Sequence, residues 1–111
     1  MTDWAFLIGV SEYDNSMDFL PLAFCDQYVE EIADILQDGG YQKDRIFTLT
    51  SVGDRKSNKN QIMASFIRFL RNIKPKDNLV IYFVGHGGTF QDTGYLFPKD
   101  AYIDHRDLNT M

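Results

Sequence analysis

The sequence predicts an α/β fold in which helices cover both faces of a mainly parallel β-sheet. Short apolar runs typical of strands alternate with longer segments of helical periodicity, in the order β-α-β-α-β. The connections between the strands are long enough for right-handed crossovers onto a parallel sheet. At 111 residues and 44% hydrophobic composition, the chain can bury one modest core, so we expect a single domain.

The first strand is expected at Ala5–Val10, a short apolar run followed by a polar loop that begins at Ser11. A helix is expected to begin at Leu22 and to end at the glycine pair Gly39-Gly40, because apolar residues recur at helical spacing at Leu22, Cys25, Val29, Ile32, Ala33 and Leu36. Acidic residues fill the opposite face of this helix, which we expect to be solvated.

The second strand is expected at Arg45–Thr50 and is followed by a polar loop. Asn58 can cap the next helix, with Gln61 three residues later in a pattern like a capping box. The buried stripe of this helix is predicted to comprise Ile62, Phe66, Phe69, Leu70 and Ile73, and Pro75 is expected to end it.

The third strand is the most informative part of the chain. Leu79–Val84 is apolar throughout, which predicts a central strand covered on both faces, and His86 follows it between glycines. Sites form at the carboxyl ends of strands in open α/β sheets, so we expect His86 to lie in a site. Gly85, Gly87 and Gly88 allow positive φ angles and close approach of the backbone.

The pattern changes after His86. Segments Thr89–Gln91 and Tyr95–Phe97 flank a turn at Asp92-Thr93-Gly94, which predicts a hairpin, and Asp104 or Asp107 could cap a helix through Leu108. Three parallel strands with the central one last would leave a sheet edge in need of partners. We therefore expect residues 1–111 to be the N-terminal portion of a larger domain, or one chain of an associating pair.

Composition and charge exclude several classes of protein. The net charge is −5, and residues 1–42 hold nine acids and no Lys or Arg, which argues against nucleic-acid binding. The basic cluster Arg55, Lys56 and Lys59 is expected in a solvated loop. The apolar runs are too short for a membrane span, and no signal peptide precedes the first run, which favours the cytoplasm. Cys25 is the single cysteine, so a disulfide or a cysteine metal cluster within these residues is excluded.

Several motifs occur in a characteristic order along nearly the whole chain. They are the strand at Ala5–Val10, an L-P-x-A-x-x-D element at Leu20–Asp26, Leu49-Thr50 at a strand end, YF-x-GHG at Tyr82–Gly87 and GYL-x-P-x-D at Gly94–Asp100. This ordered set resembles the p20 large-subunit region of the caspase-like cysteine peptidases of peptidase family C14, and the metacaspase and bacterial branches most closely. The resemblance implies a three-layer αβα caspase-like fold, of which residues 1–111 form the N-terminal portion.

The resemblance implies roles for two residues. His86 matches the catalytic histidine, which works with a cysteine thiolate and later protonates the leaving amine. Gly87 matches the residue whose backbone N–H helps to stabilise the oxyanion. In caspases the nucleophilic cysteine follows the histidine by about 50 residues, which places it near position ~136, in the remainder of the domain or in a second chain. Cys25 lies on an apolar helix stripe and is not expected to replace it.

Charge suggests the specificity of such a peptidase. Animal caspases hold a substrate aspartate with an Arg near the end of the first strand, but Ser11–Asp26 holds four acids and no base. In metacaspases the Asp of the L-P-x-A-x-x-D element lines the S1 pocket, and Asp26 occupies that position. We therefore expect protein or peptide substrates cleaved after Arg or Lys. No cofactor is expected from these residues. A calcium requirement stays open, because the acidic residues that the family uses for it would lie outside this chain.

The same residues could have purely structural roles. His86 could be a structural histidine, and Asp26 an ordinary exposed helical acid. His105 is expected at the surface, and Asp92 and Asp100 are expected to be turn and loop acids.

Other functions are also compatible with parts of the sequence. The VIYFVGHGGTF segment resembles the oxyanion loop of lipase-like α/β-hydrolases, although a G-x-S-x-G elbow is absent from these 111 residues. A non-catalytic caspase-like adaptor is a further alternative, and a nucleotide-binding module is disfavoured because no Gly-rich phosphate motif follows a strand. The 111 residues alone are expected to lack peptidase activity.

Overall fold

The computed structural model describes residues 1–102. In chain order the elements are β1 (Asp3–Gly9), α1 (Cys25–Asp38), the short 3-10 helix η1 (Lys43–Arg45), β2 (Ile46–Leu49), α2 (Lys59–Leu70), β3 (Asn78–Val84), β4 (Gly87–Phe90) and β5 (Thr93–Leu96). The predicted alternation of strands and helices is confirmed.

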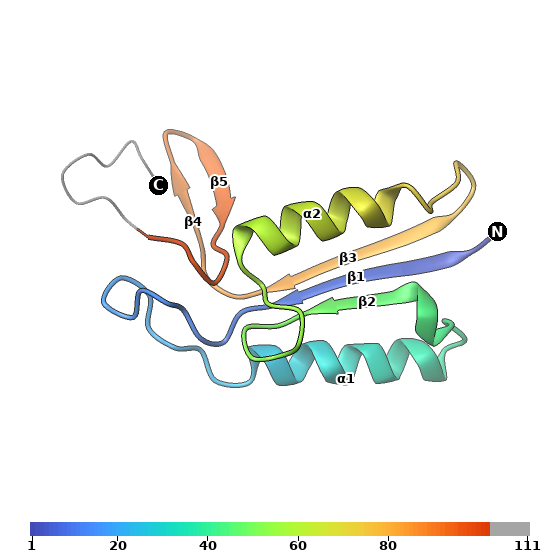
Figure 1. The fold of residues 1–111 in the computed structure, drawn as a ribbon, viewed down its shortest axis with the longest axis horizontal. Helices are drawn as coiled ribbons and strands as arrows, with labels where there is room; N and C mark the ends of the chain where they lie inside the picture. The colour runs from blue at the N-terminus through green and yellow to red at the C-terminus, as the bar shows by residue number, and fades with distance from the viewer. Residues whose placement is uncertain (103–111) are drawn as a thin grey trace.

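Three parallel strands form the main sheet, in the order β2-β1-β3. Helix α1 covers one face of this sheet and α2 covers the other, which gives three layers (Figure 1). The predicted α/β fold is therefore confirmed. Because the strands are parallel, their carboxyl ends lie together at one end of the sheet, next to the β4–β5 hairpin (Figure 1).

Successive residues of β1 belong to two different cores, because neighbouring side chains of a strand point to opposite faces. On the α1 side, Leu7 is fully buried in a cluster with Val29. On the α2 side, Phe6 is fully buried, and its ring centroid lies 5.1–5.3 Å from those of Phe47, Phe66 and Phe69. Strand β1 is thus the strand that both helices cover.

The prediction that Leu79–Val84 forms the central strand is wrong for the described residues. Strand β1 is central, and β3 pairs with β1 alone among residues 1–102. As a result, Val80 and Ile81 of β3 are 37% and 55% exposed. Apolar residues on both faces of a strand indicate that it can be buried, but they do not specify which neighbour covers it.

Helix α1 begins at Cys25, later than the expected start at Leu22. Leu22 belongs to the preceding loop, where its N–H donates to the carbonyl oxygen of Ser11 over 2.8 Å. Phe24 lies between loop and helix with φ 73°, in the left-handed region that non-glycine residues rarely adopt. The helix ends before Gly39-Gly40 as predicted, and Gly40 has φ 106°.

Helix α2 has the predicted N-cap. The side-chain oxygen of Asn58 accepts the N–H of Gln61 over 2.9 Å. The helix ends at Leu70, before Pro75 is reached. Leu70 is 43% exposed, so its predicted place in the buried stripe is wrong, whereas the other four predicted residues pack in the core: Ile62, Phe66, Phe69 and Ile73.

The predicted hairpin is present as β4 and β5, which pair antiparallel. Its turn is formed by Gln91 and Asp92, with φ 50° and 65°, rather than by the expected segment Asp92–Gly94. Two successive positive φ angles are typical of a type I′ turn, and Asp tolerates this conformation. The helix expected near Asp104–Leu108, and His105, lie outside the described residues.

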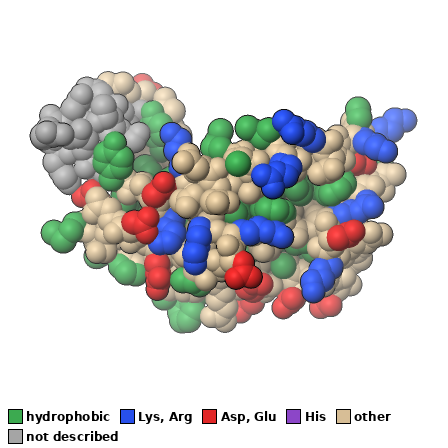
Figure 2. Space-filling model, viewed as in Figure 1, with side chains coloured by type: hydrophobic (Ala, Val, Ile, Leu, Met, Phe, Trp, Pro, Cys, Tyr) green, Lys and Arg blue, Asp and Glu red, His purple; other side chains and the backbone are tan. Residues whose placement is uncertain are grey.

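Charge is unevenly distributed over the surface. Acidic side chains gather over α1, and most of the visible basic side chains lie elsewhere on the same face (Figure 2). The expected solvated acidic face of α1 is confirmed, since four of its acids are exposed: Glu30, Glu31, Asp34 and Asp38. Neither helix in the described part of the chain is long and apolar enough to cross a membrane.

Candidate active site at the carboxyl end of the sheet

Three segments meet around the half-buried ring of His86, which follows β3. Tyr13 and Phe19 belong to the loop after β1, and their ring centroids lie 5.1 and 5.9 Å from that of His86. Phe97 follows β5, and its ring centroid lies 5.0 Å from that of Phe19. Tyr13 and Phe19 are both buried, so the imidazole packs against two aromatic side chains that the core holds in place.

The imidazole of His86 is oriented by a backbone carbonyl group. Its Nε2 atom lies 2.8 Å from the carbonyl oxygen of Leu20. A carbonyl oxygen can only accept a hydrogen bond, so Nε2 carries the proton in this contact. In the neutral ring Nδ1 is then the unprotonated nitrogen, and it is the atom that can take up a proton.

The backbone of His86 is also held on both sides. Its N–H donates to the hydroxyl oxygen of Tyr13 over 2.8 Å, and its carbonyl oxygen accepts the N–H of Phe97 over 3.0 Å. The Tyr13 hydroxyl in turn donates to the carbonyl oxygen of Phe97 over 3.0 Å. Burial raises the pKa of Tyr13, while the hydrogen bond from His86 acts in the opposite direction. The hydroxyl group therefore stays protonated at neutral pH.

The glycines around His86 allow neighbouring atoms to lie close to the backbone. A Cβ atom on Gly85 would lie 2.9 Å from the hydroxyl oxygen of Tyr13, and one on Gly87 would lie 3.2 Å from the carbonyl oxygen of Tyr95. None of Gly85, Gly87 and Gly88 uses the positive φ that glycine allows. Gly87 is exposed at the start of β4, immediately after His86.

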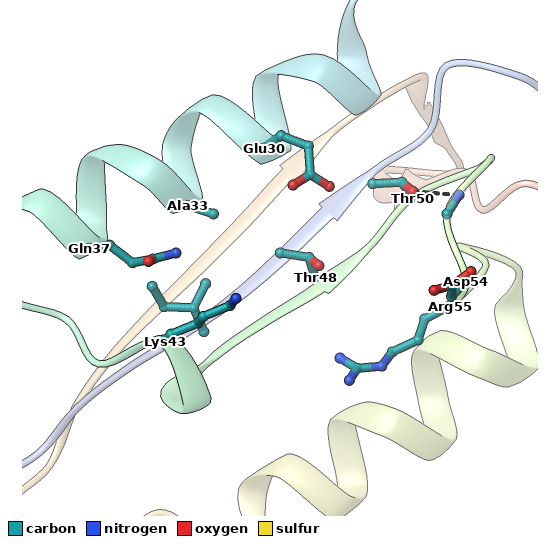
Figure 3. A pocket seen from close by; sticks show the side chains of 10 residues that line it. Glu30, Ala33, Gln37, Lys43, Thr48, Thr50, Asp54 and Arg55 are labelled. Carbon is teal, nitrogen blue, oxygen red and sulfur yellow. Dashed lines mark hydrogen bonds between the residues drawn. The ribbon is translucent and has the colours of Figure 1, made fainter.

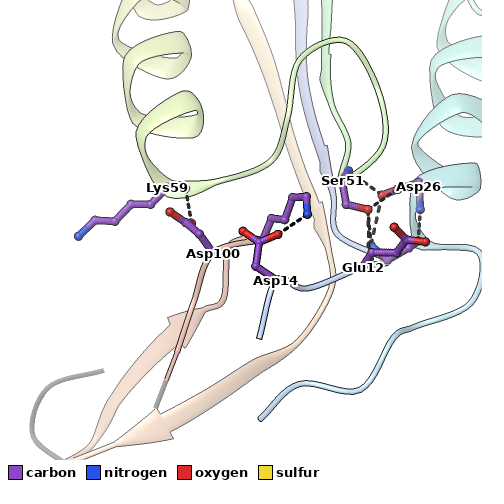
Figure 4. A network of polar contacts seen from close by, with 8 residues as sticks. Glu12, Asp14, Asp26, Ser51, Lys59 and Asp100 are labelled. Carbon is purple, nitrogen blue, oxygen red and sulfur yellow. Dashed lines mark hydrogen bonds and ion pairs between the residues drawn. The ribbon is translucent and has the colours of Figure 1, made fainter. Parts of the chain in front are cut away.

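Asp26 lies in the first turn of α1 and joins three segments through its half-buried carboxylate. Its Oδ1 accepts the N–H groups of Ser11 and Ser51 over 3.3 and 3.2 Å, and its Oδ2 accepts the Ser51 hydroxyl over 2.5 Å. Ser11 follows β1 and Ser51 follows β2. The carboxylate therefore ties the ends of two strands to the start of α1 (Figure 4).

Ser51 completes this network. Its hydroxyl oxygen accepts the N–H groups of Ser11 and Glu12 over 3.2 and 3.1 Å, while its proton is donated to Asp26. Ser51 is 2% exposed, so these bonds are shielded from water. His86 and Asp26 both lie at the carboxyl end of the sheet, but separate networks hold them.

Comparison with known proteins assigns the chain to a family. The family model described as "Metacaspase, peptidase C14 domain" matches residues 4–109. The chain belongs to this family. It is 32% identical over 93 residues to Metacaspase-1 of Scheffersomyces stipitis, a match that covers 80% of this chain and 22% of that relative. The chain thus spans about a fifth of the length of the curated relative it matches. The resemblance seen in the sequence motifs is confirmed.

Cys25 is not placed for nucleophilic chemistry in this member of the metacaspase family. It is buried at the start of α1, where its backbone carbonyl oxygen lies close to Gly9. Burial raises the pKa of its thiol, and the nearby charge of Asp26 raises it further. A protonated, inaccessible thiol is a poor nucleophile.

Two further acids near this end of the sheet, Asp14 and Asp100, have polar partners. Asp92 lies in the β4–β5 turn, as predicted. Asp100 is a loop acid, and its carboxylate accepts the N–H of Lys59 at the start of α2 over 2.8 Å, while Asp14 forms an ion pair with Lys99 (Figure 4). Among residues 1–102, no group of three or more His, Cys, Asp or Glu side chains is arranged to hold a metal ion.

A cleft of about 590 Å³ lies elsewhere, between α1, β2 and the loop that follows β2 (Figure 3). Glu30, Lys43, Thr48 and Arg55 are among its lining residues, and neither His86 nor Asp26 lines it. Arg55 is exposed as expected, although its guanidinium group also lies 4.2 Å from the ring centroid of Phe47. The candidate active site at the strand ends therefore lies apart from this cleft.

Sequence reasoning missed three groups that position the predicted residues. They are the Leu20 carbonyl group, the Tyr13 hydroxyl group and Ser51. The carbonyl group has no sequence signal, because every residue carries one. Tyr13 and Ser51 could have been found as polar residues that follow β1 and β2, at the strand ends where His86 was already expected.

Proposed function

We propose that this chain is the histidine-bearing, N-terminal portion of a caspase-like cysteine endopeptidase domain. The nucleophilic cysteine comes from polypeptide outside residues 1–111. The observation that carries the proposal is the orientation of His86, whose Nε2 is engaged by the Leu20 carbonyl group while Nδ1 is left to exchange a proton. Membership of the metacaspase family supports this assignment.

In the proposed reaction, Nδ1 of His86 takes the proton of the cysteine thiol, and the thiolate attacks the scissile carbonyl carbon. The resulting imidazolium keeps its Nε2–H on the Leu20 carbonyl oxygen. The Nδ1 proton then passes to the leaving amine as the C–N bond breaks. Water deprotonated by Nδ1 hydrolyses the thioester, and the acid product and the thiol are released.

Gly87 is proposed to stabilise the oxyanion of the tetrahedral intermediate through its backbone N–H. It follows His86 directly and is exposed, so a substrate carbonyl oxygen can approach it. A side chain at this position would crowd the carbonyl oxygen of Tyr95 at 3.2 Å. Loss of one preorganised oxyanion donor costs roughly 2.7–4 kcal/mol of transition-state stabilisation.

The partner that supplies the cysteine is proposed to dock on the edge of β3 that no strand pairs with among residues 1–102. Val80 and Ile81 are 37% and 55% exposed there, which is a large exposure for apolar residues in the middle of a strand. Pairing with a further strand would satisfy the backbone groups of this edge and bury both side chains. It would also place new residues beside the end of β3, next to His86.

Asp26 is proposed to bind the basic side chain of a P1 Arg or Lys. Its Oδ1 accepts two N–H groups and its Oδ2 accepts one hydroxyl group, whereas a carboxylate offers about four acceptor positions. Oδ2 therefore keeps capacity for a charge-assisted bond from the substrate. The absence of any Lys or Arg from residues 1–42 leaves the negative charge around Asp26 uncompensated by bases in this part of the sequence.

Labelling with an electrophile tests the proposed function. A polypeptide that continues beyond residue 111 is treated with a peptidyl-Arg chloromethyl ketone, and the labelled residue is identified by mass spectrometry. We expect the label on a cysteine after residue 111, and no turnover of a peptidyl-Arg substrate by residues 1–111 alone. Labelling of Cys25, or turnover by the 111 residues, would contradict the proposal. A continuation without such a cysteine would favour the adaptor function.

The specificity assignment needs its own experiment. Asp26→Ala in the peptidase-competent polypeptide should lower kcat/KM for an Arg substrate much more than for a matched norleucine substrate. The matched control is Asp34→Ala, an exposed acid on the same helix. An unchanged Arg preference in the Asp26 variant would refute the assignment and leave the role of His86 untouched.

A further inference from the structure

The Tyr13 hydroxyl group occupies an unusual place in the β4–β5 ladder. The register pairs Gly87 with Leu96 and Gly88 with Tyr95, so His86 lies opposite Phe97 one position further along. In an antiparallel ladder, one class of opposed residues exchanges two N–H···O bonds. Phe97 donates its N–H to the His86 carbonyl oxygen over 3.0 Å, which makes one of the two.

The second bond of this pair is replaced by a two-step relay. The His86 N–H donates to the Tyr13 hydroxyl oxygen over 2.8 Å, and the hydroxyl group donates to the Phe97 carbonyl oxygen over 3.0 Å. The hydroxyl group is thus inserted between a donor and an acceptor that would otherwise bond directly. It ends the ladder at His86 and holds the two backbones apart there.

The surroundings of Tyr13 fix its hydroxyl group in this position. Tyr13 is 6% exposed and its ring stacks on Phe19, with centroids 5.2 Å apart. Gly85 leaves the space that the hydroxyl group needs, since a Cβ atom there would lie 2.9 Å from it. The loop after β1 therefore contacts His86 twice, through Tyr13 at the backbone and through the Leu20 carbonyl oxygen at Nε2.

We propose that Tyr13 is a positioning residue, whose hydroxyl group bridges the backbones of His86 and Phe97 and thereby holds the His86 imidazole on the Leu20 carbonyl oxygen. This inference rests on the proposed role of His86 for its catalytic meaning. Without the hydroxyl group, the His86 N–H either loses its partner or bonds directly to the Phe97 carbonyl oxygen. Both outcomes shift the His86 backbone and loosen the bond between Nε2 and Leu20.

Nuclear magnetic resonance of the 111-residue chain tests this arrangement without any peptidase activity. Wild-type protein should show an Nε2–H resonance for His86, because the Leu20 carbonyl group protects that proton from exchange. Tyr13→Phe keeps the ring and its packing, and should broaden this resonance beyond detection by accelerating its exchange at least tenfold. Tyr28→Phe, which removes a hydroxyl group from a 45% exposed tyrosine of α1, should leave the resonance unchanged. An unchanged Nε2–H resonance in folded Tyr13→Phe protein would overturn the proposal.

A second measurement on the wild-type chain keeps the proposal testable if Tyr13→Phe does not fold. Scalar couplings across hydrogen bonds should connect the Phe97 nitrogen to the His86 carbonyl carbon, and should not connect the His86 nitrogen to the Phe97 carbonyl carbon. A coupling in the second direction would refute the relay. Neither measurement depends on catalysis, so failure of the proposed peptidase function would leave these results standing, and their failure would leave that function open.

Discussion

Asp26→Asn should destabilise the fold measurably, because the Asp26 side chain is required as an acceptor at both oxygens. Oδ1 faces two N–H donors, from Ser11 and Ser51, and Oδ2 faces the Ser51 hydroxyl group. That hydroxyl oxygen already accepts from Ser11 and Glu12, so its proton must point to Asp26. An Asn amide places a donor against one of these donors in either of its two orientations.

The size of the effect follows from the bonds lost. A hydrogen bond to a charged group contributes about 1.5–3 kcal/mol, and an acid in the first turn of a helix about 0.3–1 kcal/mol. Because Asp26 is only half-buried, water compensates part of this loss, and we expect a decrease of about 1–3 kcal/mol in the free energy of unfolding. With a urea m-value of about 2 kcal/mol/M, the unfolding midpoint should fall by roughly 0.5–1.5 M.

Urea unfolding of the 111-residue chain, followed by circular dichroism, measures this change. Asp34→Asn is the matched control, since it removes one exposed acid from the same helix, and it should stay within about 0.5 kcal/mol of wild type. Equal stability of Asp26→Asn and Asp34→Asn would refute the structural role of the carboxylate network.

Three further predictions concern other parts of the molecule. Gly85→Ala should lower the free energy of unfolding by about 1–3 kcal/mol, because its Cβ would lie 2.9 Å from the Tyr13 hydroxyl oxygen. The control Gly94→Ala, whose Cβ would have nothing within 4 Å, should lower it by less than about 0.5 kcal/mol in the same urea assay. Equal losses of stability would contradict this packing. Alkylation of Cys25 at neutral pH should be at least about tenfold slower in the native chain than in urea, because burial raises the pKa of the thiol, and equal rates would show that it is accessible. The pKa of Asp77 is lowered by hydrogen bonds from the Lys74 N–H, the Trp4 indole and the Thr2 N–H, so the ionised carboxylate stabilises the fold above the ordinary carboxyl pKa and this stabilisation is lost as pH falls through the lowered pKa. In thermal unfolding, Asp77→Asn should be less stable than wild type at pH 7, and the difference should be smaller at pH 3. A difference that does not change with pH would refute the assignment.

Local chemistry made much of the fold predictable. The spacing of apolar residues located both helices, and the Asn58 cap was correct to the residue because a side-chain oxygen three positions before an N–H is a local arrangement. The predicted start of α1 is too early because Leu22 continues the helical spacing, yet its N–H donates to the carbonyl oxygen of Ser11 at the start of the same loop. The prediction that β3 is the central strand was wrong because the neighbours of a strand depend on tertiary contacts, which leave no local pattern in the sequence.

The candidate site was predictable in its residues but not in its geometry. The position of His86 after an apolar strand placed it at the strand ends, and the structure confirms that location. The orientation of its ring depends on a carbonyl group of Leu20, 66 positions away, and on the hydroxyl group of Tyr13. Such contacts between remote segments carry no local pattern, so they emerge only from the packed chain.

The most direct test of the central claim is the turnover number of a peptidase-competent polypeptide that contains residues 1–111, measured on a peptidyl-Arg substrate for wild type and His86→Ala. General acid–base catalysis contributes about 10²–10⁴-fold, so the variant should lose at least about 100-fold in kcat while its melting temperature stays close to that of wild type. A folded His86→Ala variant with kcat within about tenfold of wild type would contradict the assignment of His86 as the catalytic histidine.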